Sequence, residues 1–398
     1  MSAFSDSARP GPKTTLYDHA VALARQYPDV PLPADGKPYP NADERDVSQL
    51  NDERSDSDGT LTSQLIDNYF ATPTQHRDIA QLYRTVIEYN VPIHPSPAIV
   101  EAIGRADPDQ VRQLGWHLAR TSTDPEPTVL GIAILAEVGT AEDVPLIQTI
   151  GLLSNTFGPL SAKALARLPD ATTNLIWLAD RAAGWGRVYL VGAICRLGDP
   201  AAEPWLLRKP CDGDYLNGYF AHKVAAAAPF HEAIAQPDAD EDLVDHTGTL
   251  LSTLVWSQGM SGTILHYDHS EQVLSDYLSH VTRLAPNLSR YGLLWTLARF
   301  LDGHADFSPP DWATLESLRT GYWLVTPDCT AVALRTDRSN KQRTRTDTRM
   351  GVIRSARARS KCRRQWRKSV IDHNQIHCPP ILVRVLIPQG RSSNPLPH

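Results

Sequence analysis

Long apolar runs, paired cysteines and catalytic signatures are scarce or missing in this chain of 398 residues. No run of about eighteen apolar residues occurs, so no membrane-spanning helix is expected. The first residues lack a basic segment followed by an apolar core, so no secretory leader is expected. The five cysteines are odd in number and form no CxxC pair, which argues against a disulfide framework or a zinc site. These absences favour a soluble, cytoplasmic protein with reduced thiols.

Motifs for nucleophilic, phosphate or metal chemistry are also missing. The chain contains no GxSxG motif, no Walker-type glycine loop and no dinucleotide-binding fingerprint. His266, Asp268 and His269 bring metal-ligating types together, but no glutamate completes a metalloprotease pattern. The acidic run Asp238–Asp242 lacks the glycine and closing glutamate of a calcium loop, and it indicates a charged helix start instead. We therefore expect no metal and no cofactor, and the sequence leaves open whether the protein is an enzyme.

A sequence repeat with a period of about thirty residues, in the middle of the chain, is its strongest positive signal. Val138, Leu168 and Leu197 fall into register at steps of 30 and 29 residues. In each unit an apolar helical pattern leads to a Gly or Pro turn and then to a second helical pattern. A period of this length is typical of stacked helix–turn–helix units. The sequence therefore predicts an all-α fold, an α-solenoid of stacked helical hairpins (HEAT-like) with irregular N- and C-terminal segments.

Composition divides the chain into three parts. Residues 1–60 are acidic and Pro-rich, and we expect them to be largely disordered apart from an amphipathic helix over 15–26. Residues 61–325 form the predicted repeat region, with the clearest repeats at 127–208. Residues 326–398 are predicted to form a basic tail with little ordered structure.

The tail differs sharply from the rest of the chain in charge. From residue 330 onward, sixteen lysines and arginines face three acidic residues, a net charge of +13; the other 23 basic and 42 acidic residues give −19. Three explanations remain open: an out-of-frame gene end, a nucleic-acid-binding arm, and a disordered tail resting on the acidic body.

A distinctive signature lies in the third repeat and just after it. It begins with Gly184, Trp185, Gly186 and Arg187 and continues with Cys195, Arg196, Leu197, Trp205, Leu206, Leu207, Arg208, Cys211, Asp212, Asn217, Gly218 and Tyr219. Over residues 127–234, about a quarter of the chain, this pattern resembles a group of bacterial HEAT-like repeat proteins. The resemblance implies an all-helical solenoid and brings no catalytic residue with it. The chain departs from that pattern at 217–220, where a more acidic stretch is expected.

Aromatic and cationic side chains in this signature are the candidate binding residues. Arginine offers a planar donor fork for carboxylate or phosphate, and tryptophan offers an amphipathic platform. The candidate partner-binding residues are Trp185, Arg187, Trp205, Arg208 and Asp212. The alternative is packing, in which both tryptophans fill space between repeats and both arginines pair with Asp180, Glu203 or Asp212.

These observations favour a non-catalytic scaffold or adaptor that binds a protein partner on the concave solenoid face. The alternative is a HEAT-like repeat enzyme acting on nucleic acid, of the DNA glycosylase type, or a lyase, because such scaffolds permit catalysis. A body charge of −19 disfavours polyanions, so nucleic acid is expected only through the basic tail. No membrane contact is expected, and the oligomeric state is left open.

Overall fold

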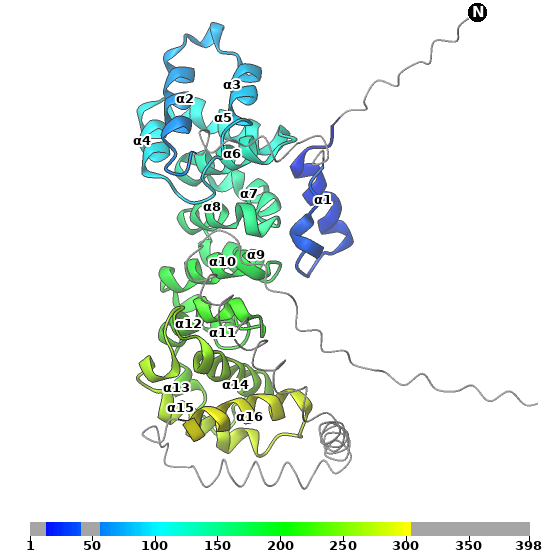
Figure 1. The fold of residues 1–398 in the computed structure, drawn as a ribbon, viewed down its shortest axis with the longest axis vertical. Coiled ribbons are helices and arrows are strands. Elements are labelled where there is room, and N and C mark those ends of the chain that lie inside the picture. Colours follow the sequence, from blue (N-terminus) through cyan, green and yellow to red (C-terminus); the bar gives the residue numbers. More distant parts are fainter. Residues whose placement is uncertain (1–12, 41–55, 304–398) are drawn as a thin grey trace, which may run out of the picture. The chain divides into compact units, whose positions relative to one another are not determined.

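The computed structural model describes residues 13–40 and 56–303 (Figure 1). Within these two ranges it contains sixteen α-helices, several short 3-10 helices and no strand, which confirms the predicted all-α class. None of the described helices is long and apolar enough to cross a membrane. The basic tail and the end of the predicted repeat region lie outside the described residues.

The α-helices are α1 (Leu16–Gln26), α2 (Thr60–Ala71), α3 (Ile79–Val86), α4 (Pro97–Arg105), α5 (Pro108–Thr121), α6 (Pro125–Val138), α7 (Val144–Gly151), α8 (Ser154–Arg167), α9 (Ala171–Ala179), α10 (Gly184–Leu197), α11 (Glu203–Leu206), α12 (Ala221–Ala227), α13 (Phe230–Ala233), α14 (Glu241–Trp256), α15 (Ser270–Val281) and α16 (Leu288–Gly303). The 3-10 helices are η1 (Pro33–Gly36), η5 (Thr74–His76), η6 (Ala141–Asp143), η7 (Pro200–Ala202), η8 (Tyr215–Tyr219) and η9 (Ile264–His266).

Polar caps and prolines set many of the helix starts. The carboxylate of Asp107 accepts from the amide of Gln110 at the start of α5, and Pro108 occupies the first helical turn. Asp240 caps α14 in the same way. Because the first amides of a helix have no partner within the helix, such caps stabilise each start by about 1 kcal/mol. At the other end, Gly198 closes α10 in the left-handed conformation that glycine adopts without strain.

The helices contact one another in two series. Helices α4, α6, α8, α10, α12, α14 and α16 pack each on the next, and α5, α7 and α9 do the same (Figure 1). The three repeat phrases correspond to α6 with α7, α8 with α9, and α10 with η7 and α11. Leu135, Leu165 and Ile194 hold the same position in the three phrases, and all three are fully buried. The thirty-residue register therefore marks the core face of these helix pairs.

Part of the segment expected to be disordered is ordered. Helix α1 appears where the sequence predicts it and packs against α5 and α7. The carboxylate of Asp35 accepts hydrogen bonds from the amide of Asn155 and the hydroxyl of Ser154, and thereby caps α8. Tyr39 donates to the hydroxyl of Thr156. Residues 13–40 are thus fixed by partners more than a hundred positions away, which local composition does not reveal.

Candidate functional site

The two glycines of the signature have structural roles at the start of α10. Gly184 has φ +58°, and the amide of Gly186 donates to Oδ1 of Asn155. A Cβ on Gly186 would lie 2.1 Å from Oγ of Ser154, so only glycine permits this close approach of α8 and α10. The signature therefore fixes the position and direction of α10.

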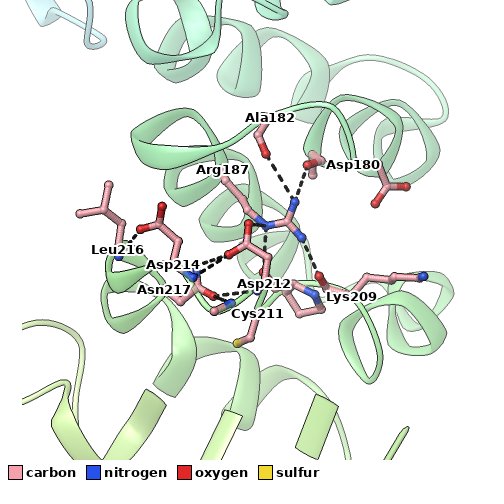
Figure 2. Close-up of polar contacts among 12 residues, drawn as sticks. Asp180, Ala182, Arg187, Lys209, Cys211, Asp212, Asp214, Leu216 and Asn217 are labelled. Atoms are coloured by element: carbon pink, nitrogen blue, oxygen red, sulfur yellow. Dashed lines mark hydrogen bonds and ion pairs between the residues drawn. The ribbon is translucent and has the colours of Figure 1, made fainter. Parts of the chain in front are cut away.

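Arg187 lies inside the protein, where its guanidinium binds backbone carbonyls. Its side chain is 7% exposed, and it donates to the carbonyls of Ala179, Ala182, Lys209 and Pro210 (Figure 2). Its Nε also lies 3.5 Å from Oδ2 of Asp212. These contacts tie the end of α9 to the loop after α11, and they use the planar donor fork internally. They match the packing alternative for Arg187.

Trp205 and Arg208 are also engaged within the chain. Trp205 is 9% exposed, its Nε1 donates to Asp180 at 2.8 Å, and its ring lies 5.9 Å from the guanidinium of Arg187. Arg208 pairs with Asp240, at 2.6 Å between Nη2 and Oδ2. Asp240 was not among the predicted partners, because it belongs to the start of α14, a helix beyond the third repeat.

Asp212 belongs to a loop that organises itself through Asn217. Oδ1 of Asn217 accepts from the amides of Asp212 and Gly213, and its Nδ2 donates to Oδ1 of Asp212 (Figure 2). Oδ1 of Asp212 also accepts from the amide of Asp214. The stretch 217–220, where the sequence departs from the HEAT-like pattern that it resembles, therefore begins at an asparagine that holds this loop together.

Trp185 is the one candidate residue of the signature that projects its ring to the surface. It is 40% exposed, and it stacks on Tyr189 one turn later, with 6.1 Å between centroids. Its ring also lies 4.7 Å from that of Tyr219, and His94 meets Tyr189 edge-on at 5.3 Å. We call His94, Trp185, Tyr189 and Tyr219 the aromatic cluster. Each of its members comes from α10 or from a segment packed near it.

A groove of about 500 Å³ lies beside the aromatic cluster. Its lining residues are His94, Pro95, Pro159, Ala162, Lys163, Ala166, Val188, Tyr189, Gly192, Ala193, Arg196, Leu197, Tyr219 and Lys223. The residues that α8 and the middle of α10 contribute are mostly small, so side chains do not fill the valley between the two helices. None of the lining residues is an aspartate or a glutamate.

Three of the lining side chains are cationic. Lys163 pairs with Glu137. Arg196 and Lys223 are exposed, and within the described residues neither has a hydrogen bond or an ion pair. Burial lowers the pKa of His94, which leaves this ring neutral at physiological pH. The positive charge of the groove therefore comes from the lysines and the arginine.

Neither described cysteine is a competent nucleophile at neutral pH. Burial raises the pKa of Cys195 to about 11, although the nearby Lys223 and Arg196 oppose the shift. Burial also raises the pKa of Cys211, whose amide donates to Nε2 of His246. Both thiols thus stay protonated, and the thiolate is the reactive form.

The histidines of the HxxH stretch have structural contacts. Nδ1 of His266 accepts from the amide of Thr263, and the ring of His269 stacks on His231 with 3.7 Å between centroids. Across the described ranges, no three histidine, cysteine or carboxylate side chains are grouped so as to hold a metal ion.

Of the residues on this surface, the sequence selects only Trp185 as a candidate binding residue, although Arg196 and Tyr219 also belong to the signature. A signal was present, since Trp185, Tyr189, Gly192 and Arg196 follow one another at helical spacing on one face of α10. His94, Tyr219 and Lys223 come from other elements, and no local pattern links them to α10. Comparisons with protein-family models, curated proteins and solved structures found no match, so the HEAT-like resemblance stays a prediction.

Proposed function

We propose that this chain is a non-catalytic scaffold or adaptor, a HEAT-like α-solenoid that binds a protein partner at the groove beside the aromatic cluster. The observation that carries this proposal is the exposure of Trp185. Its neighbours in the signature are buried or packed, whereas its ring lies at the surface against two tyrosines. Tryptophan, tyrosine and arginine are the side chains that most often dominate the binding energy of protein interfaces.

The scaffold beneath the groove supports the same proposal. Gly186 holds α10 tightly against α8, and buried Arg187 anchors its first turn to two other segments. Trp185 and Tyr189 therefore project from a fixed helix and not from a loop. A surface that is already in place loses little conformational entropy when a partner binds.

The chemistry of the groove supports binding more than catalysis. No carboxylate lines it to act as a general acid or base, and the thiol of Cys195 is protonated at neutral pH. The glycosylase and lyase alternatives each require catalytic side chains close together, and the lining residues of the groove supply no such set. Binding of a partner segment requires an open groove, aromatic side chains to pack against and charged side chains to pair with, and the lining residues provide all three.

Affinity capture with matched variants tests the proposal. The full chain, Trp185→Ala and Trp116→Ala are each immobilised, and the retained proteins are compared by mass spectrometry. Trp116 on α5 is 46% exposed and belongs neither to the aromatic cluster nor to the groove lining, so its variant removes a ring of similar exposure elsewhere. We expect a protein that the wild type and Trp116→Ala retain and Trp185→Ala loses. Identical sets of proteins for all three baits, with unchanged circular dichroism, contradict the proposal.

A further inference from the structure

Two cations of the groove, Arg196 and Lys223, have no partner within the described residues and line the same surface. Elsewhere on the described chain, Arg84 pairs with Asp78, Arg105 with Asp67 and Arg208 with Asp240. Carboxylates are abundant, since the chain up to residue 329 carries −19. In this acidic background Arg196 and Lys223 nonetheless face the groove without a carboxylate of the described chain beside them. The groove is therefore a locally positive site on an acidic protein.

The positions of the two cations and the aromatic rings determine the orientation of a ligand in the groove. Arg196 comes from the last turn of α10 and Lys223 from the first turn of α12, the next helix of the same series. Tyr189 and Tyr219 line the groove with them, and the ring of Trp185 lies next to both tyrosine rings. A ligand thus meets two positive charges and an aromatic wall at once.

This combination matches a peptide better than a nucleic acid. A nucleic acid carries a phosphate at every nucleotide and needs a basic track, and an acidic body repels the phosphates beyond the groove. A peptide segment places one or two charges where the cations are and remains neutral on either side. Its aromatic or proline side chains pack on tyrosine and tryptophan rings.

We infer that the groove binds an acidic segment of a partner protein, with one or two carboxylates against Arg196 and Lys223 and an apolar side chain on Tyr189 and Tyr219. This inference rests on the proposed function, because it names the chemistry of the partner at the same groove. Guanidinium and carboxylate form paired hydrogen bonds, and the ammonium of Lys223 adds a second charge contact. Charge complementarity of this kind determines which partner is selected.

Selection from a random peptide library displayed on phage tests the inference without knowledge of the partner. The full chain and the double variant R196E/K223E serve as baits. For the wild type we expect enrichment of peptides with aspartate or glutamate next to tryptophan, tyrosine, phenylalanine or proline. The double variant should select lysine- and arginine-containing peptides, and the wild-type peptides should bind it at least about tenfold more weakly.

A control double variant, R25E/K209E, makes the same charge change at two exposed positions outside the groove lining. It should select the same acidic peptides as the wild type. If the control loses them as well, the effect is one of net charge and the inference fails. Trp185→Ala separates the two proposals. If the peptides depend on Trp185 but are neutral or basic, the acidic inference is overturned while the proposed function stands. If no peptide depends on Trp185, both are overturned.

A labelled single-stranded oligothymidylate serves as the competing ligand. We expect any binding to the wild type to be unchanged in R196E/K223E, because the basic tail is its expected source. Binding that R196E/K223E abolishes and R25E/K209E retains would assign the groove to nucleic acid and would overturn the peptide inference.

Discussion

Acidification is expected to loosen the structure around His246 before the pH reaches the range of ordinary carboxylates. His246 is buried in α14, its Nε2 accepts from the amide of Cys211, and its Nδ1 donates to the carbonyl of Leu207. With one ring nitrogen accepting a hydrogen bond and the other donating one, both contacts require the neutral imidazole. A proton on Nε2 would face the amide hydrogen of Cys211, inside the protein and near the cation Arg187. The ring thus has no favourable way to become charged while the fold is intact.

The size of the effect follows from the two pKa values of His246. Burial lowers the pKa in the folded state from 6.5 to about 4, so the open state takes up a proton first as the pH falls. Stability is therefore complete above pH 6.5, falls between pH 6.5 and about 4, and falls no further for this reason below that. The full difference is about 3 kcal/mol, and about 2 kcal/mol is expected at pH 5.

Amide hydrogen exchange measures this effect locally. The Cys211 amide, corrected for its intrinsic exchange rate, should lose protection by about 20-fold between pH 7 and pH 5. In His246→Gln, whose side chain does not titrate, the corrected protection should be nearly independent of pH over this range. Equal losses in the wild type and the variant would refute the reasoning, because the loss would then come from other groups.

Three further perturbations test the packing. Gly186→Ala places a methyl group against Ser154 and should destabilise by about 1–3 kcal/mol, whereas Gly292→Ala, with no atom within 4 Å of the new carbon, should stabilise by up to about 1 kcal/mol; urea unfolding of both variants checks the opposite signs. Arg187→Met strands several backbone carbonyls and should cost about 3 kcal/mol or more by the same assay, and a loss below about 1 kcal/mol would contradict the buried-anchor interpretation. Asp35→Ala removes the cap of α8 and should cost about 1 kcal/mol, seen as faster proteolysis within residues 13–40 but not within α14.

The helix pairs in the middle of the chain were predictable because the repeat places equivalent residues in equivalent surroundings. Leu135, Leu165 and Ile194 are buried at the same step, and this burial is what makes the pattern visible in the sequence. Helix α1 was predictable from its pattern, but the order of the segment 27–40 after it was not. Its anchor is the carboxylate of Asp35 on the start of α8, and an acidic residue in an acidic, Pro-rich stretch looks solvated until its partner is known.

Within the signature, spacing contained more information than residue type. Trp185 and Arg187 are two positions apart on one helix, so their side chains cannot share a face. If the tryptophan is at the surface, the arginine points inward, as the structure shows. Arg196 belongs to the signature but is not among the candidate binding residues, because it follows Cys195 in a stretch that looks like ordinary repeat core. Its cationic neighbour Lys223 lies on a helix outside the clear repeats.

The anchoring of residues 13–40 also affects the order of folding. Asp35 meets Ser154 and Asn155, which are made 119 and 120 residues later, whereas α5 and α6 are neighbours in sequence. During synthesis the segment therefore leaves the ribosome well before its docking surface exists, and contacts over such separations form late. The helix pairs are expected to assemble first and to receive the N-terminal segment afterwards. A nascent chain stalled before α8 should consequently leave this segment open to proteases or chaperones.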